Sequence, residues 1–272
     1  MQHGQNNFIN TPLAIDKAFF LSIIPTIILG YQQKDFLSAE KIVEKAHKNI
    51  ELQASEAQDL GADVFPVVLN ISGPIMKYSS YYYLGTQDMI SILKNLDQHP
   101  QVSGIVLNID SGGGMVSGTA ELTATIKGLS KPTIAFTNGY MCSAAMDIAS
   151  GANMRMASPY ADMIGSIGTM MSYQDFSAMF EKWGATIYEL YAPQSTEKNK
   201  EFRELQAGNK EAYEERLRVL TEDFIGRMKE NLSESIQDDD LVFKGKTYGP
   251  KEALAVGLID EIGTLEDALN KF

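Results

Sequence analysis

Apolar residues alternate along the chain between two patterns from about residue 64 to residue 190. Short runs that are apolar almost throughout, such as VSGIVLNID at residues 102–110, are typical of strands buried on both faces of a parallel sheet. Between these runs, apolar positions recur every three or four residues, as they do on one face of a helix. We therefore expect an α/β domain whose strands are joined by right-handed helical crossovers.

The same patterns place the individual elements. Strands are predicted over residues 63–75, 102–110 and 131–139, and helices over residues 34–60, 86–99, 117–129 and 142–150. Thr86 is the predicted N-cap of the second helix, and Pro100 lies beyond its end. One face of the first helix carries Ile42, Val43, Ala46 and Ile50. A long helix of mixed, solvated charges is predicted over residues 211–232, followed over 242–272 by a turn and two short helices joined near residues 257–263.

The most apolar run is AFFLSIIPTIILGY, at residues 18–31. Its uncharged core is shorter than the roughly 20 residues that a membrane-spanning helix needs, and Pro25 interrupts it. The residues before it are not the short basic region of a secretory signal. We therefore expect residues 1–60 to dock against the body or a partner subunit, and residues 61–272 to form the main domain. Association with a membrane surface is the less favoured alternative.

Composition narrows the functional classes. The chain has 272 residues, of which 44% are hydrophobic and 21% charged, and both fractions are ordinary for a soluble globular protein. Its net charge of −12 would repel phosphate backbones, which argues against nucleic-acid binding as the main role. The single cysteine, Cys142, excludes an internal disulfide and a cysteine-rich zinc site. The three histidines are far apart in the sequence, so we expect no metal site.

A glycine-rich turn, NIDSGGGMVSG, directly follows the predicted strand that ends at Asp110. Gly112, Gly113 and Gly114 allow unusual backbone angles and close approach to a ligand. The lysine and hydroxyl of a phosphate-binding loop are absent, and so is the dinucleotide fingerprint. The turn is therefore either structural or an oxyanion hole, in which backbone N–H groups stabilise charge developing on a carbonyl oxygen.

A lone serine, Ser143, follows the next predicted strand in the stretch NGYMCSAAMDIAS. It could simply be a small residue that begins a helix, or it could be a nucleophile. Since successive parallel strands end at the same edge of a sheet, Ser143 and the glycine-rich turn can converge. No histidine lies at a comparable strand end, but a lysine can act as the base where burial lowers its pKa. Lys198 and Lys200, in the polar stretch 192–211, are the candidates.

Four stretches in combination resemble the signal peptide peptidase A family of Ser-Lys peptidases: LNIDSGGGMVSG, GYMCSAAMDIAS, ASPYADMIGSIGTMM and EALAVGLIDEIG. The resemblance covers about residues 64–269 and is greatest to the short, single-domain members, which include phage head maturation proteases. It implies a Clp protease/crotonase-like α/β fold, with a mainly parallel sheet and flanking helices, and no cofactor. It also implies that Ser143 is the nucleophile, and that the thiol of Cys142 is a buried neighbour.

The resemblance implies roles for further residues. Gly113 and Gly114 match the paired glycines of the family's oxyanion hole, and the N–H of Ala144 is a second candidate donor. Gly112 stands where the family usually has proline, which predicts a more flexible loop. The lysine base is expected downstream of EKWGATIYELY; Lys198 is favoured over Lys200 because it requires the smaller insertion.

We therefore predict a serine endopeptidase with a Ser143–Lys198 dyad that acts on a peptide or protein substrate. Phage head maturation and signal-peptide degradation are the two candidate roles, which would place it in the cytoplasm or in an assembling phage head. The resemblance further implies a homo-oligomeric ring whose neighbouring subunits share active sites, with capsid or scaffold proteins as candidate partners. Two alternatives remain: an inactive assembly or scaffold relative, and a crotonase-like acyl-CoA enzyme.

Overall fold

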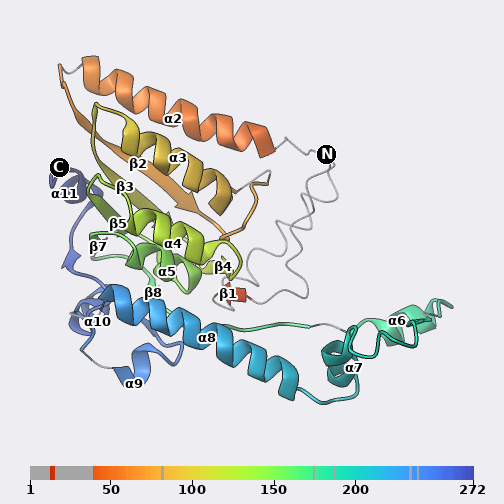
Figure 1. Ribbon diagram of the computed structural model, residues 1–272. Coiled ribbons are helices and arrows are strands. Elements are labelled where there is room, and N and C mark those ends of the chain that lie inside the picture. The colour runs from red at the N-terminus through yellow and green to blue at the C-terminus, as the bar shows by residue number, and fades with distance from the viewer. Residues whose placement is uncertain are drawn as a thin grey trace.

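The computed structural model describes residues 13–15, 39–59, 61–80, 83–173, 175–186, 188–232, 235–237 and 239–272. At its centre lies a five-stranded sheet with strand order β10-β7-β5-β3-β2, in which every neighbouring pair is parallel (Figure 1). Its strands are β2 (Phe65–Ser72), β3 (Val102–Asp110), β5 (Thr133–Thr137), β7 (Met154–Ala157) and β10 (Glu261–Ile262). The predicted α/β class with a mainly parallel sheet is confirmed.

Two smaller sheets involve segments close to the carboxyl ends of these strands. In one, β8 (Met163–Gly165) lies between β6 (Tyr140–Cys142), to which it is parallel, and β9 (Thr247–Tyr248), to which it is antiparallel. In the other, β1 (Leu13–Ile15) pairs antiparallel with β4 (Gly113–Met115). The first of these sheets therefore includes the residues that immediately precede Ser143, and the second includes part of the glycine-rich turn.

The helices agree with most of the predicted elements. They are α2 (Ala39–Asp59), α3 (Thr86–Gln98), α4 (Thr119–Lys127), α5 (Ala144–Ser150), α6 (Ser177–Lys182), α7 (Lys200–Gln206), α8 (Glu211–Leu232), α9 (Asp239–Val242), α10 (Pro250–Ala255) and α11 (Leu265–Leu269). The long helix over residues 211–232 and the two short C-terminal helices are confirmed. Helix α7 was not predicted, and it lies within the stretch that the sequence indicated only as polar.

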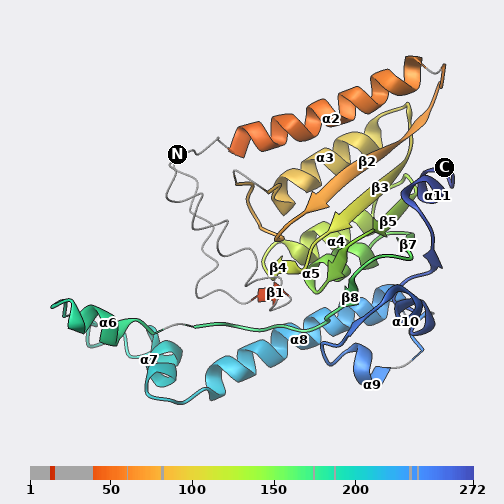
Figure 2. The same ribbon diagram turned by 180° about the vertical axis from the view of Figure 1, so that it is seen from behind.

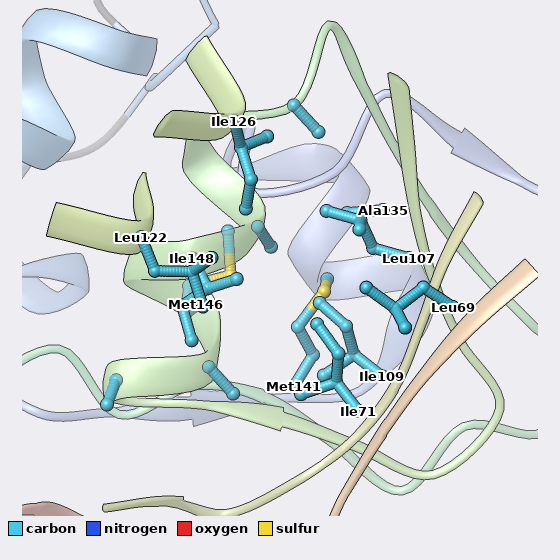
Figure 3. Packing of buried hydrophobic residues seen from close by; sticks show 14 of the residues in the cluster. Leu69, Ile71, Leu107, Ile109, Leu122, Ile126, Ala135, Met141, Met146 and Ile148 are labelled. Atoms are coloured by element: carbon cyan, nitrogen blue, oxygen red, sulfur yellow. The ribbon is translucent and has the colours of Figure 1, made fainter. Parts of the chain in front are cut away.

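The main core lies between the sheet and helices α4 and α5, which follow β4 and β6. Figure 3 shows Leu122 and Ile126 of α4, and Met146 and Ile148 of α5, near the side chains that β2 and β3 contribute to this cluster. Residues of α11 pack against a second cluster, which contains Val106, Ile134 and Phe136. Each such buried aliphatic side chain stabilises the fold by about 1.5–3 kcal/mol. Burial on both faces explains why β3 is apolar almost throughout.

Helix α2 covers the open edge of the sheet at β2. The side-chain amide of Gln53 donates to the carbonyl of Val68 at 3.0 Å, and its oxygen accepts from the N–H of Val68 at 2.7 Å. An edge strand that is covered in this way cannot pair with another chain at that residue. The predicted apolar face of this helix is confirmed, since Ile42, Val43, Ala46 and Ile50 pack against the main core.

The prediction that Thr86 caps α3 is wrong. Gly85 is the N-cap, and Thr86 is the first helical residue, with a buried side chain. A Cβ at Gly85 would collide with the backbone of Tyr78 and Ser79, so the cap position requires glycine. The Ser79 hydroxyl accepts from the N–H of Gly85 itself at 2.8 Å and so fixes the backbone at the start of the helix.

The apolar run at residues 18–31 lies outside the described residues. Among the helices that the structure describes, none combines the length and the apolar character needed to cross a membrane.

Between β8 and α8 the chain leaves the body as an extended arm, which we define as the described residues between 170 and 210. Helices α6 and α7 lie at its far end in both views (Figures 1 and 2). Neither helix has a buried residue. Large apolar side chains are instead exposed along the arm, among them Trp183 at 72% and Leu190 at 94%. The arm therefore has no apolar core of its own in these two helices.

Candidate active site

Ser143 occupies a sharp turn between β6 and α5. Its backbone has φ 57° and ψ −120°, in a region that residues other than glycine seldom adopt. The Ser143 N–H donates to the carbonyl of Gly165 at 2.7 Å, and the Ser143 carbonyl accepts from the N–H of Asp147 at 3.0 Å. Such strained residues cost about 1–3 kcal/mol, persist only where their surroundings fix them, and cluster at functional sites.

The Ser143 hydroxyl does not serve the helix that it precedes. Although Ser143 is the N-cap of α5, its side chain makes no capping hydrogen bond. The hydroxyl lies instead 3.4 Å from the carbonyl oxygen of Gly168, and the residue is only 1% exposed. A small residue chosen simply to begin a helix would be expected to cap it. This geometry favours the interpretation of Ser143 as a chemical group.

The glycine-rich turn lies directly beside Ser143. Ser111 forms a parallel bridge with Met141: the Ser111 N–H donates to the carbonyl of Tyr140 at 2.8 Å. The N–H of Cys142 in turn donates to the carbonyl of Ser111 at 3.1 Å. These bonds join the chain just before the glycines to the chain just before the serine. The predicted convergence at one edge of the sheet is therefore observed.

Hydrogen bonds to the Ser111 side chain and to the Ile75 backbone hold the turn in place. The Gly113 N–H donates to the hydroxyl of Ser111 at 3.1 Å. The Gly113 carbonyl accepts from the N–H of Ile75 at 2.9 Å, and the Ile75 carbonyl accepts from the N–H of Met115 at 2.8 Å. A Cβ at Gly114 would collide with the backbone of Ile75, so this position requires glycine. The loop is thus hydrogen-bonded on both sides although Gly112 replaces the proline of the family pattern.

These bonds determine where the remaining N–H groups point. Gly113 and Met115 both bond to Ile75, and successive residues of a strand bond to opposite sides, so the N–H and carbonyl of Gly114 face away from Ile75. The N–H of Ala144 lies in the first turn of α5, where helical N–H groups have no intrahelical acceptor. The N–H of Ala144 is therefore a candidate donor beside Ser143, and the N–H of Gly114 faces β1 instead of Ile75, whereas the N–H of Gly113 is bonded to Ser111.

A buried ion pair fixes α5 behind Ser143. The Asp147 side chain is 2% exposed; it accepts from Arg227 Nη2 at 2.7 Å and from the Thr123 hydroxyl at 3.1 Å. Burial raises the pKa of Asp147, and the hydrogen bond and charge of Arg227 act in the opposite direction. The prediction that the charges of this long helix lie in solvent is wrong for Arg227, which pairs with the buried Asp147. Its partner could have been sought in Asp147, an acidic residue within an otherwise small and apolar stretch.

The two candidate lysines lie on the arm, and the structure does not bring them to Ser143 within one chain. Lys200 begins α7, which lies at the far end of the arm, whereas α5 lies in the body (Figures 1 and 2). Lys200 Nζ forms an ion pair with Glu197 at 3.0 Å, and that bond raises the pKa of Lys200, opposite to what a base needs. Lys198 is exposed, and no described residue forms a hydrogen bond or ion pair with its ammonium group.

Comparison with known proteins establishes the family. The model of peptidase family S49 matches residues 126–272, which is more than half of the chain. The chain belongs to peptidase family S49. It is therefore a serine-type peptidase, and the resemblance to the signal peptide peptidase A family is confirmed.

Three S49-like relatives illustrate the range of the similarity. A candidate protease of Methanocaldococcus jannaschii is 27% identical over 252 residues, which are 92% of this chain and 75% of that protein. Capsid assembly protease C of Escherichia phage lambda is 30% identical over 188 residues, and a candidate signal peptide peptidase SppA of Enterococcus faecium is 28% identical over 196. Each of these two matches covers 68% of this chain, but only 42% of the phage protein and 54% of the bacterial one.

Solved structures support the fold. The 1510-N membrane-bound stomatin-specific protease superposes with a TM-score of 0.52 at 19% identity, over 77% of this chain and 85% of that one. A second structure of that protease, in complex with a substrate peptide, gives the same TM-score over 80% of its chain. The predicted Clp protease/crotonase-like fold of the S49 chain is confirmed.

Proposed function

We propose that this S49 peptidase is an endopeptidase whose nucleophile is Ser143 and whose base is Lys198. The observation that carries the proposal is the turn at Ser143. The serine has a strained backbone, its hydroxyl does not cap α5, and the N–H groups of Gly114 and Ala144 belong to the segments beside it. An activated nucleophile and preorganised donors for the oxyanion are the two parts that acyl transfer requires.

Each of these residues has its own role in the proposed reaction. Neutral Lys198 takes the proton of the Ser143 hydroxyl as its oxygen attacks the scissile carbonyl carbon. The N–H groups of Gly114 and Ala144 donate to the resulting oxyanion. Lys198 then gives its proton to the leaving amine, and water hydrolyses the acyl-enzyme. Gly113 matches a further donor of the family pattern. Its N–H is hydrogen-bonded to the Ser111 hydroxyl and would have to break that bond to reach the oxyanion, so we assign Gly113 the role of shaping the loop.

Lys198 reaches Ser143 in this proposal from a neighbouring copy of the chain. Two features support a homo-oligomer: the lysine and serine lie apart in one chain, and the arm that carries the lysine exposes large apolar side chains. The exposed set comprises Phe176, Met179, Phe180, Trp183, Tyr188 and Leu190. Packing of the arm on a neighbour would bury these groups and take the lysine out of water, which favours its neutral form.

The substrate class proposed is a peptide or protein. The names of the relatives point to two roles, capsid assembly in phage lambda and signal-peptide hydrolysis in Enterococcus faecium. For this chain, phage head maturation and signal-peptide degradation are therefore the proposed roles, with a capsid scaffold or a released signal peptide as substrate. Incubation with each substrate separates the two.

The nucleophile is tested with a fluorophosphonate probe and with β-casein. Ser143→Ala should abolish both labelling and casein hydrolysis, lowering the rate by roughly 10⁴-fold or more. The fold should persist, because alanine fits the same buried space. Cys142→Ala is the matched control, since it changes the adjacent buried thiol, and it should retain both signals. The proposal would be contradicted if labelling were lost in Cys142→Ala and kept in Ser143→Ala, or if casein hydrolysis persisted in Ser143→Ala. A wild type without either signal would favour the scaffold alternative.

A further inference from the structure

A short strand of the chain itself lies along the glycine-rich turn. Strand β1 pairs antiparallel with β4 in a defined register, in which Leu13 is opposite Met115, Ala14 opposite Gly114 and Ile15 opposite Gly113. On its other edge β4 is bonded to Ile75. Residues 13–15 therefore occupy the edge of β4 that the body of the protein leaves open.

The register determines which atoms meet. Because Gly114 directs its N–H and carbonyl away from Ile75, Ala14 and Gly114 form the hydrogen-bonded type of antiparallel pair. In such a pair each N–H donates to the carbonyl of the other residue. The carbonyl of Ala14 consequently accepts from the Gly114 N–H, which is the donor that the proposed mechanism assigns to the oxyanion.

The strand runs from Ala14 toward the end of the turn that is bonded to the chain just before Ser143. From Ala14 the chain continues to Ile15, opposite Gly113, toward the end of the turn where Ser111 is bonded to Cys142. Ser143 is the residue that follows Cys142. In this register the Ala14 carbonyl faces the proposed oxyanion donor, and the bond to Ile15 follows on the side toward the serine, which is the order that a scissile bond requires.

We propose that the Ala14–Ile15 bond is a self-processing site of this peptidase; the inference rests on the proposed function of Ser143. The Ser143 oxygen attacks the Ala14 carbonyl carbon, and the bond to the Ile15 nitrogen breaks. The base carries the serine proton to the Ile15 amine, and water then releases residues 1–14 with a carboxylate at Ala14. Cleavage also clears the open edge of β4 for other peptides.

The test uses the purified full chain, with β-casein hydrolysis measured in parallel. Intact mass and N-terminal sequencing should show a new N-terminus at Ile15 that accumulates in the wild type and not in Ser143→Ala. Casein hydrolysis without any cut in the chain overturns this inference alone. A cut at another bond, or a cut that persists in Ser143→Ala, also overturns it. Loss of both reactions in the wild type contradicts the proposed function itself.

Two proline variants test the register. Ala14→Pro removes the N–H that donates to the Gly114 carbonyl, and should slow self-cleavage about tenfold or more. Leu13→Pro is the matched control, because the Leu13 N–H points away from β4 in this register, and it should slow cleavage much less. In both variants the fluorophosphonate probe should still label Ser143, which shows that the nucleophile is intact. Equal effects of the two prolines on self-cleavage would overturn the proposed pairing.

Discussion

At the scale of single residues, the backbone sets up most of the proposed chemistry. Ser143 is held in a strained conformation by the carbonyl of Gly165, and Gly114 must be glycine because the Ile75 backbone leaves no room for a Cβ. These constraints fix a hydroxyl and a donor N–H before any substrate arrives. Preorganisation of this kind removes the reorganisation cost from the reaction itself.

The choice of base is a prediction about two lysines. Lys198→Ala should lower kcat on a casein-derived peptide by about 10²–10⁴-fold, the usual contribution of a general base. Lys200→Ala should lower it less than about tenfold, because the Lys200 ammonium is held in its charged form by Glu197. Steady-state kinetics on both variants gives the ranking. The reverse ranking would assign the base to Lys200.

The pH dependence follows from the same chemistry. A protonated lysine cannot accept the proton of Ser143, so kcat should rise as pH increases from mildly acidic to alkaline. A profile measured from about pH 5 to about pH 9 on the casein-derived peptide checks this. The Ser143→Ala variant supplies the background rate at each pH. A flat profile would argue against any lysine as the base.

At the scale of elements, the short helix α5 depends on its neighbours. It has seven residues, all buried, which is too short for a helix to be stable on its own. Asp147 joins it to α8 through Arg227, and Ser150 joins it to the same helix by accepting from Asn231 at 2.9 Å. The position of the nucleophile therefore depends on α8, a helix nearly seventy residues further along the chain.

Removal of Arg227 should destabilise the fold in a pH-dependent way. Arg227→Met leaves the carboxyl of Asp147 buried and unpaired, at a cost of about 3–5 kcal/mol near pH 8. Burial raises the pKa of Asp147, so the folded variant binds a proton more readily than the unfolded chain does. Stability that depends on this proton is present at low pH and is lost as pH rises above the ordinary Asp range near 4. The cost should therefore be smaller near pH 5 than near pH 8.

Urea unfolding at the two pH values measures the effect. Arg218→Met is the matched control on the same helix, because its ion pairs with Glu215 and Glu222 are exposed to solvent and should contribute little to stability. Equal costs for the two variants, or a cost for Arg227→Met that is larger at the lower pH, would contradict the assigned role of the buried pair.

Sequence patterns predicted the elements that carry a strong period and missed those that do not. Strand β3 has the predicted bounds because its apolar run reflects burial on both faces. Strands β9 and β10 have two residues each, which is too few to show a period. Ser143 and Gly114 could be singled out as candidates because their local sequence is unusual. The bonds of Gly113 to Ser111 and Ile75, and of Asp147 to Arg227, depend on register and tertiary packing that no local pattern encodes.

At the scale of the whole molecule, the body and the arm differ in how they are built. The body encloses two apolar clusters, whereas α6 and α7 of the arm bury no residue. Trp183, Tyr188 and Leu190 are each more than 70% exposed. Large apolar groups gathered on one projecting segment indicate a surface for association. Since the same segment carries Lys198, assembly and completion of the active site would be one event.

A mixing experiment decides whether the active site is shared between subunits. Chains with Ser143→Ala and chains with Lys198→Ala should each be inactive alone. When they are unfolded together and refolded, mixed oligomers should contain some interfaces with an intact serine from one chain and an intact lysine from the other. For an interface that needs one serine and one lysine from different chains, about a quarter of the sites in a random equal mixture would be complete. Activity should therefore return to roughly that fraction of the wild-type value.

The controls separate a shared site from failed assembly. Each variant refolded alone should stay inactive, which excludes contamination, and differently tagged chains should co-purify, which shows that mixed oligomers form. Trp183→Ala in both chains should weaken association and reduce the recovered activity, because Trp183 is a large exposed side chain of the arm. If tagged chains co-purify and the mixture stays inactive while the wild type refolds to full activity, serine and lysine must come from the same chain. The arm would then have to fold back on its own body, a rearrangement that the extended form in Figures 1 and 2 does not show.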